Sequence, residues 1–213
     1  MSAVAERPYT THAPAPPPPP PPAWGGDPSV LGLPAFVVGS IALGLALVGY
    51  VSPAAGGSAL PIILAATGLG LLVSAVWAAA LGQTIVACIF GLFAGFWLSD
   101  SVLVLGLNHN WFAIPAADVT DSVALFQISW AIVMGFLTIA TLRLPVAFTA
   151  VVGLVVVALV LLVFGTTGAD ATLTKAAGWV TFTFAAIGVY LFLGAASAAT
   201  GGKGYPLGSP IVR

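Results

Sequence analysis

Charged side chains are scarce in this sequence of 213 residues. Asp, Glu, Lys and Arg account for 5% of it, whereas they account for about a quarter of a typical soluble domain. Hydrophobic residues account for 60% of the chain, and the mean hydropathy is +1.12. These values exclude a soluble globular protein and indicate an integral membrane protein. The net charge is −1 and the sequence has no basic patch, so we do not expect a nucleic acid as partner.

Residue types that carry catalysis or bind metal ions are scarce too. Cys88 is the only cysteine, which leaves neither a disulfide framework nor a cysteine metal site. The two histidines, His12 and His109, fall outside the apolar segments. No serine or histidine has a base or orienting carboxylate beside it at membrane depth, and no glycine-rich stretch has the spacing of a phosphate-binding loop. We therefore expect no enzyme activity, no metal and no cofactor.

Proline dominates the first 26 residues, with an unbroken run from Pro16 to Pro22. This stretch has no apolar run of signal-peptide length, and its composition predicts a disordered tail over residues 1–26. The proline run favours the extended polyproline II conformation. It serves either as a docking segment for a proline-binding domain or as a spacer, and the lack of flanking charge favours the spacer.

Six apolar segments follow, and each is close to the ~20 residues that a helix needs to cross the bilayer. Their predicted bounds are 34–51, 59–80, 84–106, 123–142, 145–165 and 175–198. The pattern predicts an all-α transmembrane domain over residues 27–200, surrounded by membrane lipids, and a short C-terminal tail over residues 201–213.

The entrance to the first segment combines Asp27 with Pro28 and Pro34. An Asp can accept the free N–H groups of a first helical turn, and Pro is tolerated there because it needs no donor. Pro34 would lack a donor further into the helix, so we expect a helical turn at 28–33 that bends into the first span.

The few cations set the orientation of the chain. With the N-terminus in the cytoplasm, four basic residues lie inside and only Lys175 lies outside, which agrees with the positive-inside rule. The four are Arg7, Arg143, Lys203 and Arg213. Six spans then return the C-terminus to the cytoplasm.

Two polar residues within the spans are candidates for a functional role, for example in a pore between the helices. Asp100 is the one carboxylate inside a span, and such groups are functional candidates because their burial is costly. Two explanations of Asp100 fit equally well. It acts as a proton relay, or it has no transport role and either faces an aqueous vestibule or hydrogen-bonds to Ser99 or Ser101. Gln127 is a weaker candidate, since neighbouring helices usually satisfy such amides.

Short motifs along the chain carry a family resemblance. Pro28, Leu31, Gly32, Leu33 and Phe36 match a signature of the form Asn-Pro-Ala-Pro-Leu-Gly-Leu-x-x-Phe, with Asp27 in place of the Asn. Further matches are Gly82-Gln83-Thr84, Phe93-Ala94-Gly95-Phe96-Trp97, Ala177-Gly178-Trp179 with Tyr190, and Tyr205-Pro206-Leu207-Gly208. In this order, over about residues 27–208, the chain resembles the succinate/acetate permease family, the acetate uptake transporters of bacteria and fungi.

The resemblance implies six helices around a pore within each protomer, assembled as a homohexamer in the plasma membrane. It implies transport of acetate and related small monocarboxylates, through a channel or with a proton. Three side chains then form a hydrophobic constriction, at Phe36, Phe93 and Val155. Gly188 corresponds to a small residue that lines the pore in the last helix, and Tyr190 is a possible polar group of the pore.

The chain also departs from the family. Leu71 and Ala78 stand where relatives usually have a Gln and a Glu, and Asp27 puts a carboxylate at the cytoplasmic mouth. These changes bear on the substrate. A urea or amide channel, also built from six helices, and a non-transporting scaffold subunit that recruits a partner through its proline tail are therefore the alternative functions.

The orientation can be tested by labelling. Cysteines introduced by Ser2→Cys and Ser209→Cys should react with membrane-impermeant thiol reagents only from the cytoplasmic side. A cysteine introduced by Asn110→Cys should react only from the outside. Reaction of the Ser2→Cys variant from the outside would contradict the orientation.

Overall fold

The computed structural model describes residues 25–213 of the chain, and it contains six helical segments long and apolar enough to cross a membrane. The number and order of the spans were predicted correctly. The segments are α1 (Ser29–Val48), η2 (Ile62–Gly68) continued by α2 (Leu69–Ala80), α3 (Thr84–Asn108), α4 (Val119–Ala140), α5 (Val146–Thr167) and α6 (Ala171–Ala199). Short helical turns, η1 (Pro53–Ala59), η3 (Ala116–Asp118) and η4 (Thr141–Arg143), lie in the connections.

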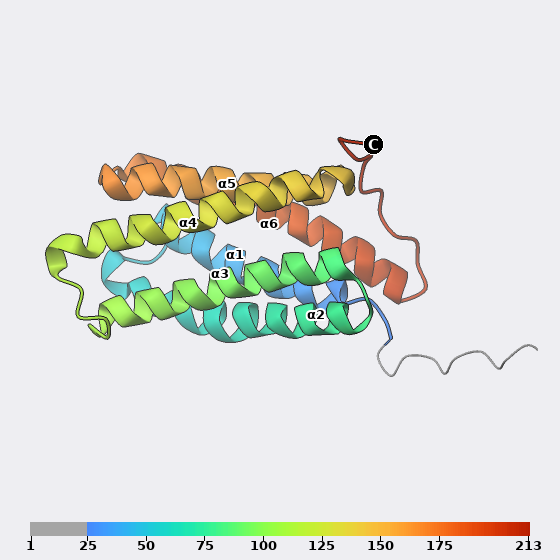
Figure 1. Ribbon diagram of the computed structural model, residues 1–213, viewed down its shortest axis with the longest axis horizontal. Helices are drawn as coiled ribbons and strands as arrows, with labels where there is room; N and C mark the ends of the chain where they lie inside the picture. The colour runs from blue at the N-terminus through green and yellow to red at the C-terminus, as the bar shows by residue number, and fades with distance from the viewer. Residues whose placement is uncertain (1–24) are drawn as a thin grey trace, which may run out of the picture.

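The helices run up and down, so that both ends of the described chain lie at the same end of the bundle (Figure 1). They pack in the spatial order α3, α2, α1, α6, α5 and α4, each against the next. The first and last of this series, α3 and α4, meet more loosely and close the bundle. Its centre is filled by buried side chains from all the spans, among them Phe36, Leu71, Phe93, Met134 and Val155.

The first helix begins where the Asp-Pro pair predicts. Asp27 Oδ1 accepts the N–H of Ser29 at 2.9 Å, and Pro28 already has helical dihedral angles. The helical turn expected at 28–33 continues into the span: Ser29–Val48 is a single helix with Pro34 inside it. A membrane helix tolerates such a proline when neighbouring helices support it, and the position costs only one backbone hydrogen bond.

This helix also ends earlier than the predicted residue 51. Gly49 adopts φ 88° and donates its N–H to Ala46 O, and Tyr50 donates to Leu45 O at 2.9 Å. Both bonds satisfy carbonyl groups of the last turn, and a left-handed glycine is the usual residue for this termination. The span is therefore shifted toward the N-terminus, to residues 29–48.

The second span is less regular than the sequence predicts. Ile62–Gly68 forms wider π-helical turns before the regular helix α2 begins. Thr67, in this segment, lies directly against Gly39 of α1, where any larger residue would collide with it. Irregular turns of this kind often occur at functional sites, and the apolar pattern alone gave no sign of them.

The chain after α6 docks on the end of the bundle. Residues 201–213, predicted as a tail, run back over the ends of α5 and α6. Ala147 donates its N–H to Leu207 O at 3.2 Å, and the Tyr190 hydroxyl donates to Pro206 O at 2.8 Å. The C-terminal segment is thereby fixed beside the end of the bundle where α1 begins.

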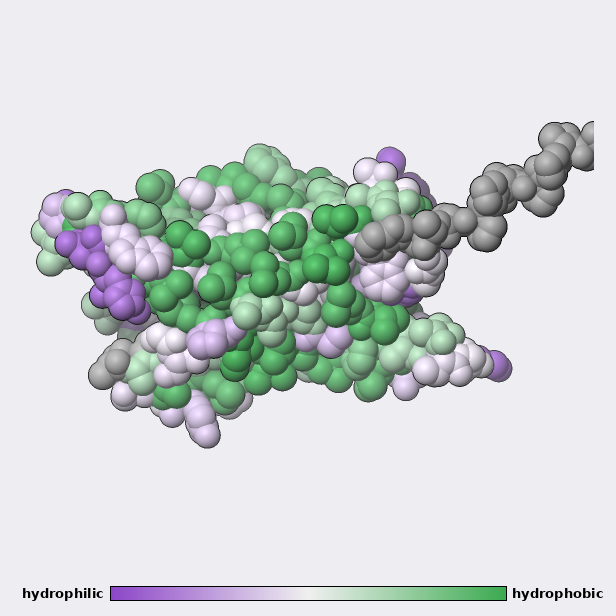
Figure 2. Space-filling model, turned by 90° about the horizontal axis from the view of Figure 1, so that it is seen from below, coloured by the Kyte–Doolittle hydropathy of each residue, from purple (hydrophilic) through white to green (hydrophobic). Residues whose placement is uncertain are grey.

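The surface is divided as a bilayer requires. Figure 2 shows a broad hydrophobic belt between two ends where hydrophilic residues gather. Large apolar side chains in the belt are exposed, for example Leu125 at 68% and Phe136 at 69%, both on α4. Lipid tails or neighbouring protomers would cover them, and the homohexamer stays a prediction.

The contact of Asp27 with Ser29 leads to a test of stability. Asp27→Asn should leave the midpoint of thermal unfolding in detergent unchanged, because Asn caps a helix about as well as Asp. Asp27→Ala should lower the free energy of unfolding by about 1 kcal/mol. If Asp27→Asn destabilised the protein as much as Asp27→Ala, the charge and not the hydrogen bond would be what matters.

Candidate functional site

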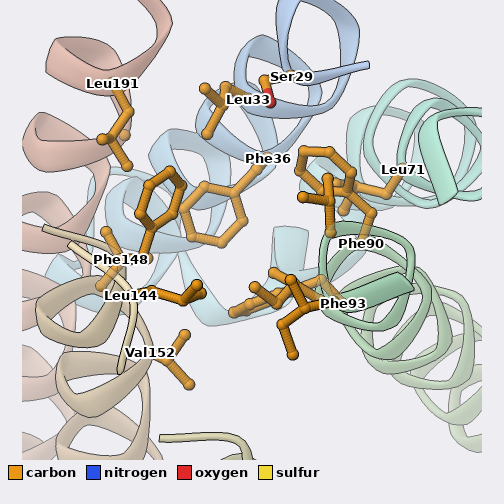
Figure 3. Close-up of a pocket in the computed structure, with 15 residues that line it drawn as sticks. Ser29, Leu33, Phe36, Leu71, Phe90, Phe93, Leu144, Phe148, Val152 and Leu191 are labelled. Carbon is orange, nitrogen blue, oxygen red and sulfur yellow. The ribbon is translucent and has the colours of Figure 1, made fainter. Parts of the chain in front are cut away.

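A cavity of about 120 Å³ lies inside the bundle, on the side of the two described chain ends. Figure 3 shows it enclosed by side chains from different helices that converge on one space. Leu33 of α1, Leu71 of α2, Phe90 of α3 and Leu191 of α6 are among them. Ser29 supplies the only hydroxyl among the lining residues. The walls are therefore almost entirely hydrocarbon.

A second, smaller cavity of about 20 Å³ lies deeper in the bundle. Its lining residues come from later turns of α1 and α3, such as Leu43 and Trp97, together with α5 and α6. Thr181 contributes its one hydroxyl. The two cavities thus follow one another along the bundle.

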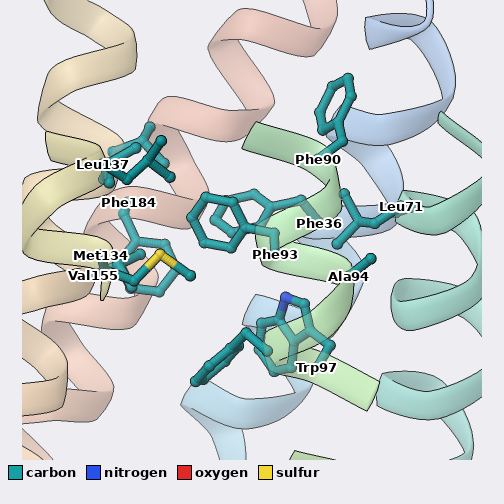
Figure 4. Close-up of a cluster of buried hydrophobic side chains, with 14 of the residues drawn as sticks. Phe36, Leu71, Phe90, Phe93, Ala94, Trp97, Met134, Leu137, Val155 and Phe184 are labelled. Carbon is teal, nitrogen blue, oxygen red and sulfur yellow. The ribbon is translucent and has the colours of Figure 1, made fainter. Parts of the chain in front are cut away.

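Two phenylalanines separate these cavities. Phe36 of α1 and Phe93 of α3 line both of them, and each is only 4% exposed. Their ring centroids lie 5.0 Å apart in an edge-to-face arrangement, and the ring of Phe184 lies 5.6 Å from that of Phe36. Figure 4 shows these rings meeting between the helices. Aromatic pairs of this geometry attract each other by ~0.5–1.5 kcal/mol beyond simple burial, so the partition is closed and stable.

Val155 and Gly188 lie on opposite sides of this partition. Val155 of α5 lines the second cavity, and Gly188 of α6 lines the first. A Cβ atom at Gly188 would lie 2.9 Å from Val37 Cγ2 and 3.4 Å from Phe36 Cδ1. Because Gly188 has no side chain, α6 can approach α1 closely and the Phe36 ring fits beside it.

The signature residues of the first helix form part of the wall of the first cavity. The ring of Phe90 lies against Gly32, where a Cβ atom would come within 2.5 Å of it. Leu33 lines the first cavity, while Leu31 is 39% exposed on the outer side of the helix. Pro28 is buried at the helix start. The motif thus builds the helix start and one cavity wall, with Leu31 facing outward.

The structure places the three polar candidates apart from the lining of these two cavities. Gln127 donates from Nε2 to Thr166 Oγ1 at 3.1 Å, between α4 and α5. Tyr190 is occupied by its bond to the C-terminal segment. Asp100 is half-buried on α3, three residues after Trp97 and hence on the same side of the helix.

Two other features could not be recognised from the sequence. Phe184 completes the aromatic contact at the partition, although it looks like any other aromatic residue of an apolar span. Within residues 25–213, three buried side-chain atoms also lack a hydrogen-bond partner: Thr67 Oγ1, Trp97 Nε1 and Gln127 Oε1. Of these residues, Trp97 lines one of the two cavities.

Comparisons with known proteins agree with this arrangement. The sequence model of the GPR1/FUN34/yaaH family matches residues 10–205. No curated protein matches the sequence significantly. A solved structure of the bacterial acetate channel SatP superposes with a TM-score of 0.76 at 23% sequence identity, covering 86% of this chain and 99% of that chain. At this identity the likeness shows a shared fold.

The approach of α6 to α1 at Gly188 can be tested by substitution. Gly188→Ala should lower the free energy of unfolding by ~1–3 kcal/mol, because it overpacks this contact. Adding Val37→Ala should recover most of the loss, since Val37 Cγ2 is the nearest atom. Thermal unfolding in detergent measures both effects.

A matched control lies on α5. A Cβ atom at Gly153 would meet Thr138 Cγ2 at an ordinary distance of 3.6 Å, so Gly153→Ala should not destabilise the protein. If Gly188→Ala were equally harmless, the close approach at Gly188 would be refuted.

Proposed function

The chain belongs to the GPR1/FUN34/yaaH family, and from this premise we propose that it is a membrane channel or carrier for acetate and related small monocarboxylic acids. The family match agrees with the sequence motifs that resemble acetate uptake transporters. The bacterial acetate channel that shares the fold supports the same substrate class. We place the protein in the plasma membrane as a homohexamer, with both termini in the cytoplasm.

The observation that carries the proposal is the pair of cavities on either side of Phe36 and Phe93. They follow one another along the inside of one protomer and share Phe36 and Phe93 in their linings, as the two halves of an interrupted path would. A cavity of about 120 Å³ has room for a molecule of a few heavy atoms. Its hydrocarbon walls suit the methyl group of acetate better than a fully polar solute such as urea.

The scarcity of polar groups in the first cavity, where Ser29 supplies the one hydroxyl, bears on whether the neutral or the ionised acid crosses. An ionised carboxylate without partners in hydrocarbon is far more costly than a neutral polar group. Asp27, exposed near the mouth of this cavity, would also repel an anion. We infer that the neutral acid passes the partition. Because the acid then carries its own proton, proton coupling needs no titratable side chain.

Uptake into liposomes tests the proposal. Purified protein in liposomes at pH 6 should take up labelled acetate faster than protein-free liposomes do, and acetate faster than urea. Protein-free liposomes correct for acid that crosses the lipid unaided. Faster uptake of urea than of acetate would overturn the proposal in favour of a neutral-solute channel.

The same assay tests the partition. Phe36→Ala should widen the partition and raise the uptake of the larger succinate relative to acetate by on the order of tenfold. A small size difference in an apolar site typically changes discrimination between substrates by about this factor. Phe148→Ala is the matched control, since Phe148 lines the first cavity but not the second. An unchanged ratio in Phe36→Ala would show that Phe36 does not limit the path.

A further inference from the structure

Hydrogen-bonding groups inside this bundle are mostly satisfied within their own helix. Ser40, Ser101 and Thr181, for example, each donate to the carbonyl four residues earlier. Such back-bonding removes the cost of an unpaired polar group in an apolar interior. Trp97 departs from this pattern: it is 1% exposed, and its indole N–H has no partner.

The position of this donor connects it to the transport path. Trp97 lines the second cavity together with Phe36 and Phe93, which form the partition. In Figure 4 the indole nitrogen lies on the edge of the ring turned toward these two phenylalanines. A solute that has passed the partition would therefore meet this N–H at once.

Thr181 supplies the complementary group in the same cavity. Its hydroxyl donates to Ala177 O at 2.9 Å, so its oxygen is left with lone pairs to accept a further hydrogen bond. Two residues at the wall of a space of about 20 Å³ thus carry one N–H donor and one acceptor oxygen. A permeating acid is larger than this space, so the side chains around it must move apart as it enters. A neutral carboxyl group has the matching pair, a carbonyl oxygen and an O–H.

We infer that Trp97 Nε1 donates a hydrogen bond to the carbonyl oxygen of the permeating acid just beyond the partition, and that Thr181 Oγ1 accepts from its O–H. The inference rests on the proposed function and deepens it. Binding here offsets the cost of bringing the acid through the apolar first cavity. It also distinguishes the neutral acid from its anion, whose oxygens would face the lone pairs of Thr181 without a proton between them.

A single water is the molecule that a space of this size admits without rearrangement. A buried water usually makes about three hydrogen bonds to polar groups, whereas the lining residues here offer one indole N–H and one hydroxyl oxygen. A water at this site would remain underbonded and easy to displace. The acid uses both groups fully, and its methyl group packs against the apolar walls.

Kinetics in liposomes test the site. Trp97→Phe keeps an aromatic ring but removes the N–H, and it should raise the half-saturating acetate concentration by roughly three- to tenfold, the range for one neutral hydrogen bond. Thr181→Val keeps the side-chain shape but removes the acceptor, and it should act in the same direction. The maximal rate should change less in both variants.

Each variant has a matched control. Trp130→Phe removes an indole N–H that already donates to Ser99 Oγ at 3.2 Å, and Thr183→Val removes a hydroxyl on the exposed side of α6. Both controls should keep the half-saturating concentration of the unaltered protein. Equal effects of Trp97→Phe and Trp130→Phe would overturn the assignment.

A second readout does not depend on flux. In an NMR spectrum of the ¹⁵N-labelled protein, the indole resonance that is lost in Trp97→Phe should shift downfield on addition of acetate, and that of Trp130 should not. Acetate uptake by the unaltered protein without this shift, and with unchanged kinetics in Trp97→Phe and Thr181→Val, would overturn the inference. A failure of the proposed function is distinguishable, because the unaltered protein would then take up no acetate.

Discussion

The fold depends on one constraint: hydrocarbon offers no partner for a polar group. Each backbone N–H and C=O within the spans must be bonded inside the protein, which selects helices. The same constraint acts on side chains, and hydroxyls such as those of Ser40 and Ser101 return to their own helix. It also makes exceptions informative, because a buried indole N–H left free, as at Trp97, has no solvent to compensate it.

The partition between the cavities is a product of helix packing. Its rings come from α1, α3 and α6, which are far apart in the sequence. They can meet because glycine brings the backbones together: Gly188 admits Phe36 and Val37, and Gly32 admits the ring of Phe90. The absence of a methyl group at two helix contacts therefore determines where the aromatic rings between the two cavities stand.

The sequence predicted the architecture well because hydropathy and helix length are local properties. The six spans and the helix start at Asp27 follow from single segments. The sequence alone does not determine how Pro34 is accommodated, because this depends on the neighbouring helices, and Ser29–Val48 is continuous through it. The π-helical turns of Ile62–Gly68 were missed for a similar reason, since they lie where Thr67 contacts Gly39 of another helix.

The site could be predicted only in part. Phe36 and Phe93 were recognised through family motifs, and the structure brings them together at the partition. Nothing in an apolar sequence distinguishes the ring of Phe184 from one that faces lipid. Trp97 belonged to a recognised motif, yet the state of its N–H depends on which groups surround it after packing. That information is three-dimensional.

Polar groups are distributed unevenly between the two cavities. Leu71, which stands where relatives usually have a Gln, leaves the first cavity with a hydroxyl only at its mouth, from Ser29. Under the proposed function, an acid entering there would lose water and gain no hydrogen bond before it reached Trp97 and Thr181 beyond the partition. The most costly point of the passage therefore lies between the mouth and the two phenylalanines, where the neutral form has its greatest advantage over the anion. The absence of polar residues at Leu71 and Ala78 is thus compatible with the proposed transport of an acid that carries its own proton.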